Sequence, residues 1–272
     1  MAAFAQRGSD GELLAAGVLR RKSDDELRFI GMVDPAARGR GIGGALLDLA
    51  LAAARDAAAD QFDAADASLA ADAASGVGLA LVVESEALSD AADGLFVSRG
   101  LRRTFAEDTL RCDTTVAERP ELADGMELVE WSNETAERFY AVYRAAFRER
   151  PDFADESAQE WIEDYGGRSD FRPQWSLLLS LAGFGDAGFI AVTADWIGEV
   201  GVVPTARRRG IAELLVRETL TRMAAAGTPH VELSVAVDNP GAAALYRRIG
   251  FVDRGRQARY RLRVGPVRQQ VR

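Results

Sequence analysis

Apolar residues along this chain recur with two different periods, and the two periods alternate in a fixed order. Residues 26–33 and 196–203 are strand-length apolar runs, and a glycine-containing turn follows each of them. Beyond the second turn, apolar residues share one helical face, as the period of about 3.6 requires: Ile211, Leu214, Leu215 and Met223. Another strand-like run comes next in both halves, at 77–83 and at 230–237. The pattern predicts two α/β domains built on the same plan.

The turns themselves repeat, which supports a duplicated architecture. Three positions recur at a constant separation of 169 residues: Pro35 and Pro204, Arg38 and Arg207, and Gly41 and Gly210. A constant separation at several positions seldom arises by chance. The two halves are therefore predicted to be diverged copies of one unit.

The copies differ in extent. The second half begins with a predicted strand at 126–131 and a helix after it, and the first half has no room for this pair. We predict a truncated domain at 1–115, a linker at 116–124 and a complete domain at 125–272. The first copy also carries an Ala/Asp-rich stretch at 54–75, which is either a lengthened helix or a loop.

The composition limits the classes of binding partner and the cellular compartment that we expect. The 272 residues carry a net charge of −9, so nucleic acid is an unfavourable partner. Because Cys112 and His230 are the sole residues of their types, the sequence predicts no intrachain disulfide and no metal site built on histidine. No signal peptide and no apolar run of about 18 residues is present, so we expect a cytoplasmic protein without membrane contact.

The glycine turn at 207–212 has the chemistry of an anion-binding loop. The first turn of a helix leaves backbone N–H groups unpaired, and the helix dipole adds partial positive charge there. Gly210 allows close approach of a phosphate, and three arginines precede it in an otherwise acidic chain. A pyrophosphate is the expected ligand, although a glycine turn of this kind is often only structural.

Two motifs together resemble the GNAT family of N-acetyltransferases. One is Val-x-Pro-x-x-Arg-x-x-Gly-x-Ala at 202–212, and the other is Asn-x-x-Ala-x-x-Leu-Tyr-x-x-x-Gly-Phe, whose counterpart here runs from Asn239 to Phe251. Asn239 can cap the helix of the second motif, and Pro240 suits its first position. The resemblance implies acetyl-CoA as cosubstrate. It implies an α/β fold with two GNAT-like domains, each a mixed, mostly antiparallel sheet flanked by helices, the first of them degenerate.

The resemblance also assigns roles to residues of the second half. It implies that backbone groups of Val200, Gly201 and Val202 hold the pantetheine arm, with Asn239 also contacting it. The pyrophosphate would lie on the loop formed by Arg207, Arg208, Arg209, Gly210, Ile211 and Ala212. Tyr246 would protonate the leaving thiolate, and Glu199 would orient the amine or accept its proton. The alternatives are a packing tyrosine and an ordinary surface carboxylate.

The first half is predicted to be catalytically silent. Its loop consists of Arg38, Gly39, Arg40, Gly41, Ile42 and Gly43, which we include among the candidate CoA-binding residues. Phe96 stands where the second half has Tyr246, and Ile30 stands where it has Glu199. Because neither side chain can transfer a proton, this half is either structural or only able to hold CoA.

The sequence therefore predicts transfer of an acetyl group to a primary amine by direct attack, with a small-molecule acceptor. The negative net charge of the chain favours a cationic or neutral acceptor. The alternative is a non-catalytic acyl-CoA sensor or interaction scaffold. The acceptor, the acyl length and the oligomeric state are not determined by the sequence.

Overall fold

The computed structural model describes residues 1–64, 79–116, 118–150, 153 and 156–265, and the chain divides into two compact units. Unit 1 consists of residues 1–107 together with 256–272, and unit 2 consists of residues 108–255. Two long strands, β5 and β11, contain residues of both units.

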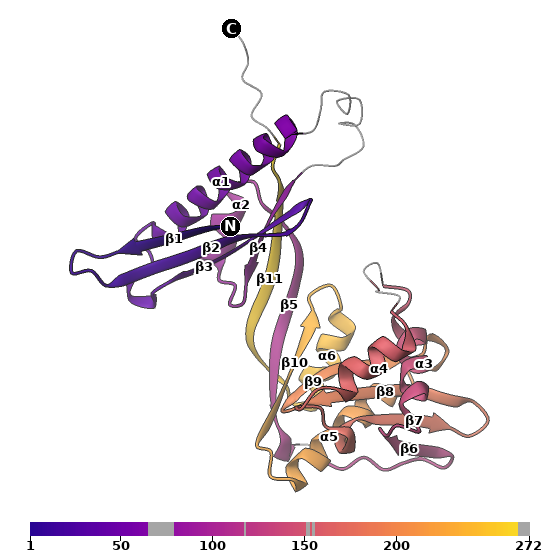
Figure 1. The fold of residues 1–272 in the computed structure, drawn as a ribbon. Coiled ribbons are helices and arrows are strands. Elements are labelled where there is room, and N and C mark those ends of the chain that lie inside the picture. Colours follow the sequence, from indigo (N-terminus) through magenta and orange to yellow (C-terminus); the bar gives the residue numbers. More distant parts are fainter. Residues whose placement is uncertain (65–78, 117, 151–152, 154–155, 266–272) are drawn as a thin grey trace. The chain divides into compact units, whose positions relative to one another are not determined.

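Unit 1 is a mixed sheet with a long helix against it (Figure 1). Its strands lie in the order β1-β2-β3-β4-β11-β5, and all neighbours among the first five are antiparallel except β3 and β4. Helix α1 packs on β1, β2 and β3. The elements are β1 (Ala2–Arg7), β2 (Leu13–Ser23), β3 (Glu26–Val33), α1 (Ile42–Ala64), β4 (Ala80–Ser85), α2 (Asp90–Val97), β5 (Arg102–Asp113) and β11 (Val252–Arg263).

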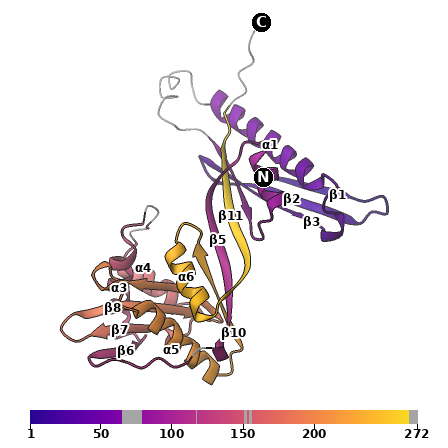
Figure 2. The same ribbon diagram turned by 180° about the vertical axis from the view of Figure 1, so that it is seen from behind.

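Unit 2 repeats this plan and adds two helices before its hairpins (Figures 1 and 2). Its strand order is β5-β10-β9-β8-β7-β6. Between β6 and β9 every pairing is antiparallel, whereas β9 and β10 are parallel. The elements are β6 (Met126–Glu130), α3 (Ala136–Phe147), α4 (Ala158–Gly166), β7 (Leu177–Leu181), β8 (Gly185–Thr193), β9 (Trp196–Val202), α5 (Ile211–Ala225), β10 (His230–Ala236) and α6 (Pro240–Ile249).

The sheet of unit 2 is covered on both faces. A methyl group added at Gly188 would meet Ile211 of α5. Gly201 of β9 pairs with Phe189 of β8, and a methyl group added there would meet Ala146 of α3. Gly188 and Phe189 are consecutive on β8, so they point to opposite faces. Helices α5 and α3 therefore lie on opposite faces of the sheet.

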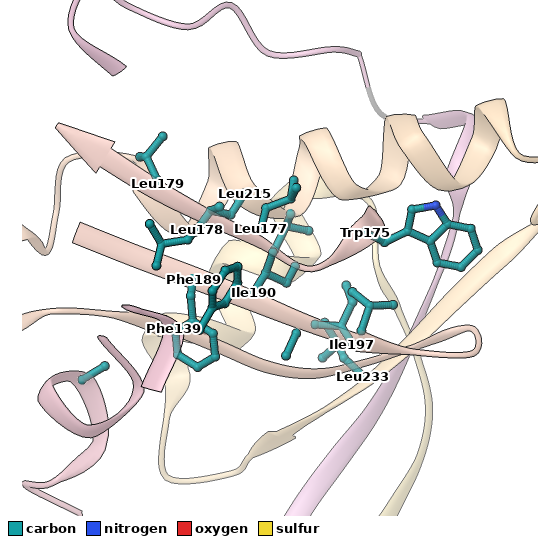
Figure 3. Packing of buried hydrophobic residues seen from close by; sticks show 14 of the residues in the cluster. Phe139, Trp175, Leu177, Leu178, Leu179, Phe189, Ile190, Ile197, Leu215 and Leu233 are labelled. Atoms are coloured by element: carbon teal, nitrogen blue, oxygen red, sulfur yellow. The ribbon is translucent and has the colours of Figure 1, made fainter. Parts of the chain in front are cut away.

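Burial on both faces explains the continuous apolar run of the central strands. Every residue of β8 from Ala187 to Val192 that bears a side chain is completely buried. Figure 3 shows part of this core, in which side chains of β7 and β8 lie beside Phe139 of α3 and Leu215 of α5. A strand covered on both faces needs no polar alternation, which is why the hairpin at 175–193 has so few polar residues.

Strands β9 and β10 diverge after a short contact. Their parallel register covers only Trp196 and Ile197, which oppose Glu232 and Leu233. On its other side β9 stays paired with β8 as far as Val202. The segment from Glu199 to Val202 therefore presents one edge that β10 does not occupy.

Unit 1 leaves one face of its sheet without a helix, since α1 and α2 are its helices within the described residues 1–64 and 79–107. Ile30 and Met32 are 42% and 72% exposed on that face of β3. The truncation predicted for the first copy therefore concerns the counterparts of α3 and α4.

The domain limits of 1–115 and 125–272 stay a prediction, and the compact units are defined by contacts instead. The boundaries between the units fall inside β5 and inside β11. The second part of β11 belongs to unit 1, because its residues from Ala258 to Arg263 pair with β4. The Ala/Asp-rich stretch continues α1 as far as Ala64, and its remainder, 65–75, lies outside the described residues. Within the described residues, no helix is long and apolar enough to cross a membrane.

Candidate active site: a cleft at the start of helix α5

A cleft of about 760 Å³ opens in unit 2 where β9 ends and α5 begins. Its walls come from the end of α3, the free end of β9, the first turn of α5 and the first turn of α6. The residues around it are Ala146, Phe147, Glu149, Arg150, Val200, Gly201, Val202, Ala206, Arg207, Arg208, Gly210, Ile211, Ala212, Glu213, Asn239, Gly241, Ala242, Leu245 and Arg248. Nine predicted cosubstrate-binding residues of the second half are among them.

The loop before α5 has a backbone that few side chains adopt. Arg208 has φ +65° and Gly210 has φ +79°, both in the left-handed region. The first hydrogen bond of the helix runs from the Leu214 N–H to the Gly210 carbonyl, at 3.0 Å. The preceding N–H groups have no acceptor inside the helix, and they lie at the edge of the cleft. This geometry suits an anion.

The three arginines of the loop have different positions. Arg207 holds the loop in place, because its guanidinium donates to the Val202 and Ala146 carbonyls at 3.2 and 3.0 Å. Arg208 lines the cleft. Arg209 does not line it and instead donates to the Thr205 carbonyl, with its guanidinium 5.8 Å from the ring of Phe184.

Asn239 lies on the opposite wall of the cleft as the N-cap of α6. Its side chain accepts a hydrogen bond from the Ala242 N–H at 3.2 Å, and Pro240 occupies the first helical position. The capping predicted from sequence is therefore confirmed, and it fixes the amide beside the cleft.

Tyr246 is buried on α6, with 8% of its surface exposed. Burial raises the pKa of the Tyr246 phenol to about 12, and the positive charge of Arg150 acts in the opposite direction. The phenol is accordingly a proton donor across the physiological range. It does not line the cleft itself.

Glu199 lies at an irregularity of β9. The β8–β9 ladder pairs Ala191 with Glu199 and Val192 with Ile197, so Gly198 is an extra, bulged residue. Bulges change the direction in which neighbouring side chains point. The Oε2 atom of Glu199 is buried and has no hydrogen-bond partner among the described residues. Burial raises the pKa of the carboxyl to about 7, against the lowering effect of the Tyr165 hydroxyl and of Arg150.

Arg150 is the feature that links these groups, and no sequence motif marks it. It lines the cleft, its guanidinium lies 4.1 Å above the Phe147 ring, and its charge lowers the pKa of both Glu199 and Tyr246. Arg248 also lines the cleft and pairs with Glu213 at 2.7 Å. Sequence reasoning assigned neither a role, because Arg150 follows α3 outside any motif and Arg248 stands at a variable position of the motif in α6.

The loop of unit 1 has the same local structure. Gly39 and Gly41 have φ +76° and +79°, as Arg208 and Gly210 do at the equivalent positions. Arg38 donates to the Val33 carbonyl at 3.4 Å, as Arg207 does to that of Val202. The repeat seen in the sequence is thus a repeat of backbone conformation.

The two active-site positions are not reproduced in unit 1. Phe96 is buried against Tyr260, with ring centroids 4.8 Å apart, and Ile30 is exposed. Neither the buried phenol nor the buried carboxylate of unit 2 has an equivalent there.

The order of these elements and the motifs around the cleft are those of a GNAT-type fold. Residues 126–251 match the acetyltransferase (GNAT) family. The chain belongs to this family and is an N-acetyltransferase.

Proteins named mycothiol acetyltransferase are similar to this chain over most of its length. The mycothiol acetyltransferase of Clavibacter michiganensis is 31% identical over 267 residues, which cover 94% of this chain and 78% of that protein. That of a Nocardioides species is 29% identical, over 81% of this chain and 75% of its own length.

Solved structures agree on the fold. A GCN5-related N-acetyltransferase from Sphaerobacter thermophilus superimposes with a TM-score of 0.71 and 26% identity, covering 97% of this chain and 81% of that one. A tandem GNAT protein from the clavulanic acid biosynthesis pathway has a TM-score of 0.59 at 19% identity, over 97% and 83% of the two chains.

The loop before α5 can be tested by Gly210→Asp. Aspartate tolerates a positive φ, but its carboxylate caps the free N–H groups and repels a phosphate. We expect the affinity for CoA to fall about tenfold or more, equivalent to about 1.4 kcal/mol. Isothermal titration calorimetry of the full chain measures this.

The matched control is Gly41→Asp in unit 1, where φ is the same. It should leave the affinity of the unit 2 cleft unchanged. Equal dissociation constants for wild type and Gly210→Asp, with unchanged thermal unfolding, would exclude the loop as a phosphate site.

Proposed function

We propose that unit 2 transfers an acetyl group from acetyl-CoA to a primary amine by direct attack. The observation that carries the proposal is the cleft, where a strand edge unoccupied by β10 meets a helix start. The two features are complementary to the two ends of the cosubstrate, since an amide-containing arm can pair with a strand and a pyrophosphate with a helix N-terminus.

In this proposal each of the predicted cosubstrate-binding residues has a physical task. The backbone groups of Val200, Gly201 and Val202 pair with the pantetheine arm as a further strand would. The N–H groups of the loop 207–212 hold the pyrophosphate, helped by the charge of Arg208. Asn239 contacts the arm from the opposite wall. Arg209 contributes charge at a distance, because its guanidinium is turned toward Phe184.

Proton transfer is assigned to the two buried groups. The amine nitrogen attacks the thioester carbonyl carbon and the C–S bond breaks, so the sulfur leaves with the electron pair. Tyr246 donates a proton to that sulfur, and Glu199 accepts the proton that the amine loses, directly or through water. Acid and base groups positioned in this way contribute about 10²–10⁴-fold each.

Unit 1 has a supporting role in the proposal. Its loop, Arg38 to Gly43, is proposed as a second CoA-contacting loop because its backbone matches that of 207–212. Phe96 and Ile30 leave it without an acid or a base, so it does not turn over.

The acceptor is proposed from the relatives. Proteins named mycothiol acetyltransferase align with nearly the whole chain, including both units. The amine that those enzymes acetylate is therefore the first candidate acceptor, and other small primary amines come next.

The function is tested by release of free thiol from acetyl-CoA across a panel of amines that includes this candidate. We expect saturable turnover with at least one primary amine at a rate of the order of 1–10³ per second, as is usual for enzymes. Tight CoA binding with no turnover on any amine would favour a non-catalytic acyl-CoA sensor instead.

Tyr246→Phe removes the proposed acid and retains the ring. We expect kcat to fall about 10²-fold or more, while the dissociation constant for CoA changes less than about twofold. Tyr140→Phe is the matched control, because the Tyr140 hydroxyl donates to the Glu156 carbonyl away from the cleft. Wild-type turnover of Tyr246→Phe would remove Tyr246 from the mechanism.

The proposed base predicts a pH profile. Glu199 acts as a base only when ionised, and its pKa is raised to about 7. The ratio kcat/KM should therefore fall as the pH drops through 7 and level off above it. The pKa of Tyr246, about 12, places the loss of the acid far above this range.

Glu199→Gln supplies the control for that profile. Glutamine is nearly isosteric with glutamate and does not titrate. The rate should therefore fall, and the decrease of kcat/KM below pH 7 (the low-pH limb) should disappear. A limb that persists unchanged in Glu199→Gln belongs to another group, and the assignment of the base would then be wrong.

A further inference from the structure

Glu199 is surrounded by titratable and charged groups from two helices and from their ends. Helix α4 contributes Tyr165 and Asp164, α3 contributes Tyr143, and the segments flanking these helices contribute Glu156 and Arg150. Only two of these groups, Tyr165 and Arg150, favour the ionised carboxylate. Of these two, Tyr165 is the neutral group that can donate its hydroxyl hydrogen.

The ring of Tyr165 is fixed by its neighbours. Its centroid lies 5.0 Å from that of Trp161, 6.0 Å from that of Trp131 and 5.4 Å from that of Phe171. Aromatic contacts at these distances hold a ring in one orientation. The direction of the hydroxyl is therefore determined by the packing of α4 on the core.

The hydroxyl of Tyr165 reaches the bulge of β9. A methyl group built on Gly198 would lie 3.4 Å from this oxygen, and Gly198 directly precedes Glu199. The Tyr165 hydroxyl therefore lies beside the bulge, next to the residue that carries the buried carboxylate. The carboxylate still has an oxygen, Oε2, with no partner among the described residues.

We infer that Tyr165 is the positioning residue of Glu199: its hydroxyl donates to the carboxylate and fixes its orientation, while an oxygen stays available for the acceptor amine. The inference rests on the proposed function, in which Glu199 receives the proton of the amine. Tyr165 touches no reacting atom and acts only through Glu199.

The electrostatics support this arrangement. Burial and the charge of Glu199 both raise the pKa of the Tyr165 phenol, so it stays protonated and remains a donor. A hydrogen bond to an ionised acceptor is stronger than one to its neutral form, so it stabilises the carboxylate over the acid. Loss of the hydroxyl should therefore raise the pKa of Glu199 above about 7.

The chain contains a matched pair of variants. Tyr165→Phe and Tyr143→Phe each delete one hydroxyl from the same aromatic cluster, and both rings contact Trp161. The Tyr143 hydroxyl donates to Oε1 of Glu156 at 3.1 Å instead of to Glu199. Any general loosening of the cluster should affect both variants equally, whereas loss of positioning should affect only Tyr165→Phe.

The kinetic experiment compares the two variants across pH. For Tyr165→Phe we expect kcat to fall about fivefold to tenfold, and the low-pH limb to move upward by about half a pH unit to one pH unit. The KM for acetyl-CoA should not change. For Tyr143→Phe the limb should stay in place. An unmoved limb in Tyr165→Phe, or the same movement in both variants, would overturn the inference.

A second readout does not depend on activity. Carbon-13 NMR of the full chain labelled at glutamate carboxyl carbons reports the titration of Glu199, identified by the signal lost in Glu199→Gln. We expect this signal to titrate at higher pH in Tyr165→Phe than in wild type, and an identical titration in both would refute the positioning role. If Glu199→Gln keeps full turnover, the proposed base fails, and the NMR titration still decides whether Tyr165 governs the carboxylate.

Discussion

The divergence of β9 from β10 is the constraint on which the site depends. Two parallel strands that share register at Trp196 and Ile197 and then separate leave backbone groups of β9 without a partner strand. Unpaired backbone groups next to a core are costly unless another molecule pairs with them. The same separation makes room for the cleft and directs the chain into the loop where α5 begins. The proposed cosubstrate site therefore depends on the break in the sheet.

The duplicated plan shows which parts of the site are general and which belong to unit 2. Strand β3 also leaves β4 after Phe29, and the following loop has the same left-handed positions. Unit 2 differs because β9 is bulged at Gly198 and α3 and α4 cover the face toward which Glu199 points. Removal from water raises the pKa of a carboxyl group, and burial is the largest cause of the raised pKa of Glu199. At the equivalent position of unit 1 there is no cover, and Ile30 is 42% exposed.

The sequence predicted the local features well and the long-range ones poorly. The loop at 207–212, the cap at Asn239 and the strand-turn-helix repeat depend on residues close together in the chain, whose chemistry can be interpreted directly. The contributions of Arg150 and Tyr165 depend on how α3 and α4 pack on β9, which periodicity does not specify.

The path of β11 is a feature that no local sequence pattern predicts, because β11 joins the sheet of unit 1 from a distant part of the chain. Tyr260, at 0% exposure among the largest buried side chains of unit 1, comes from the end of the chain and packs on Phe96. Strand β11 also completes the antiparallel pairing of β4. A fragment ending near residue 115 would therefore leave β4 with an open edge and a cavity in place of Tyr260, at a cost of several kcal/mol. The core of unit 1 therefore includes a strand that follows unit 2 in the sequence. A linear division at 116–124 separates the copies in sequence, whereas both compact units contain residues of β5 and β11.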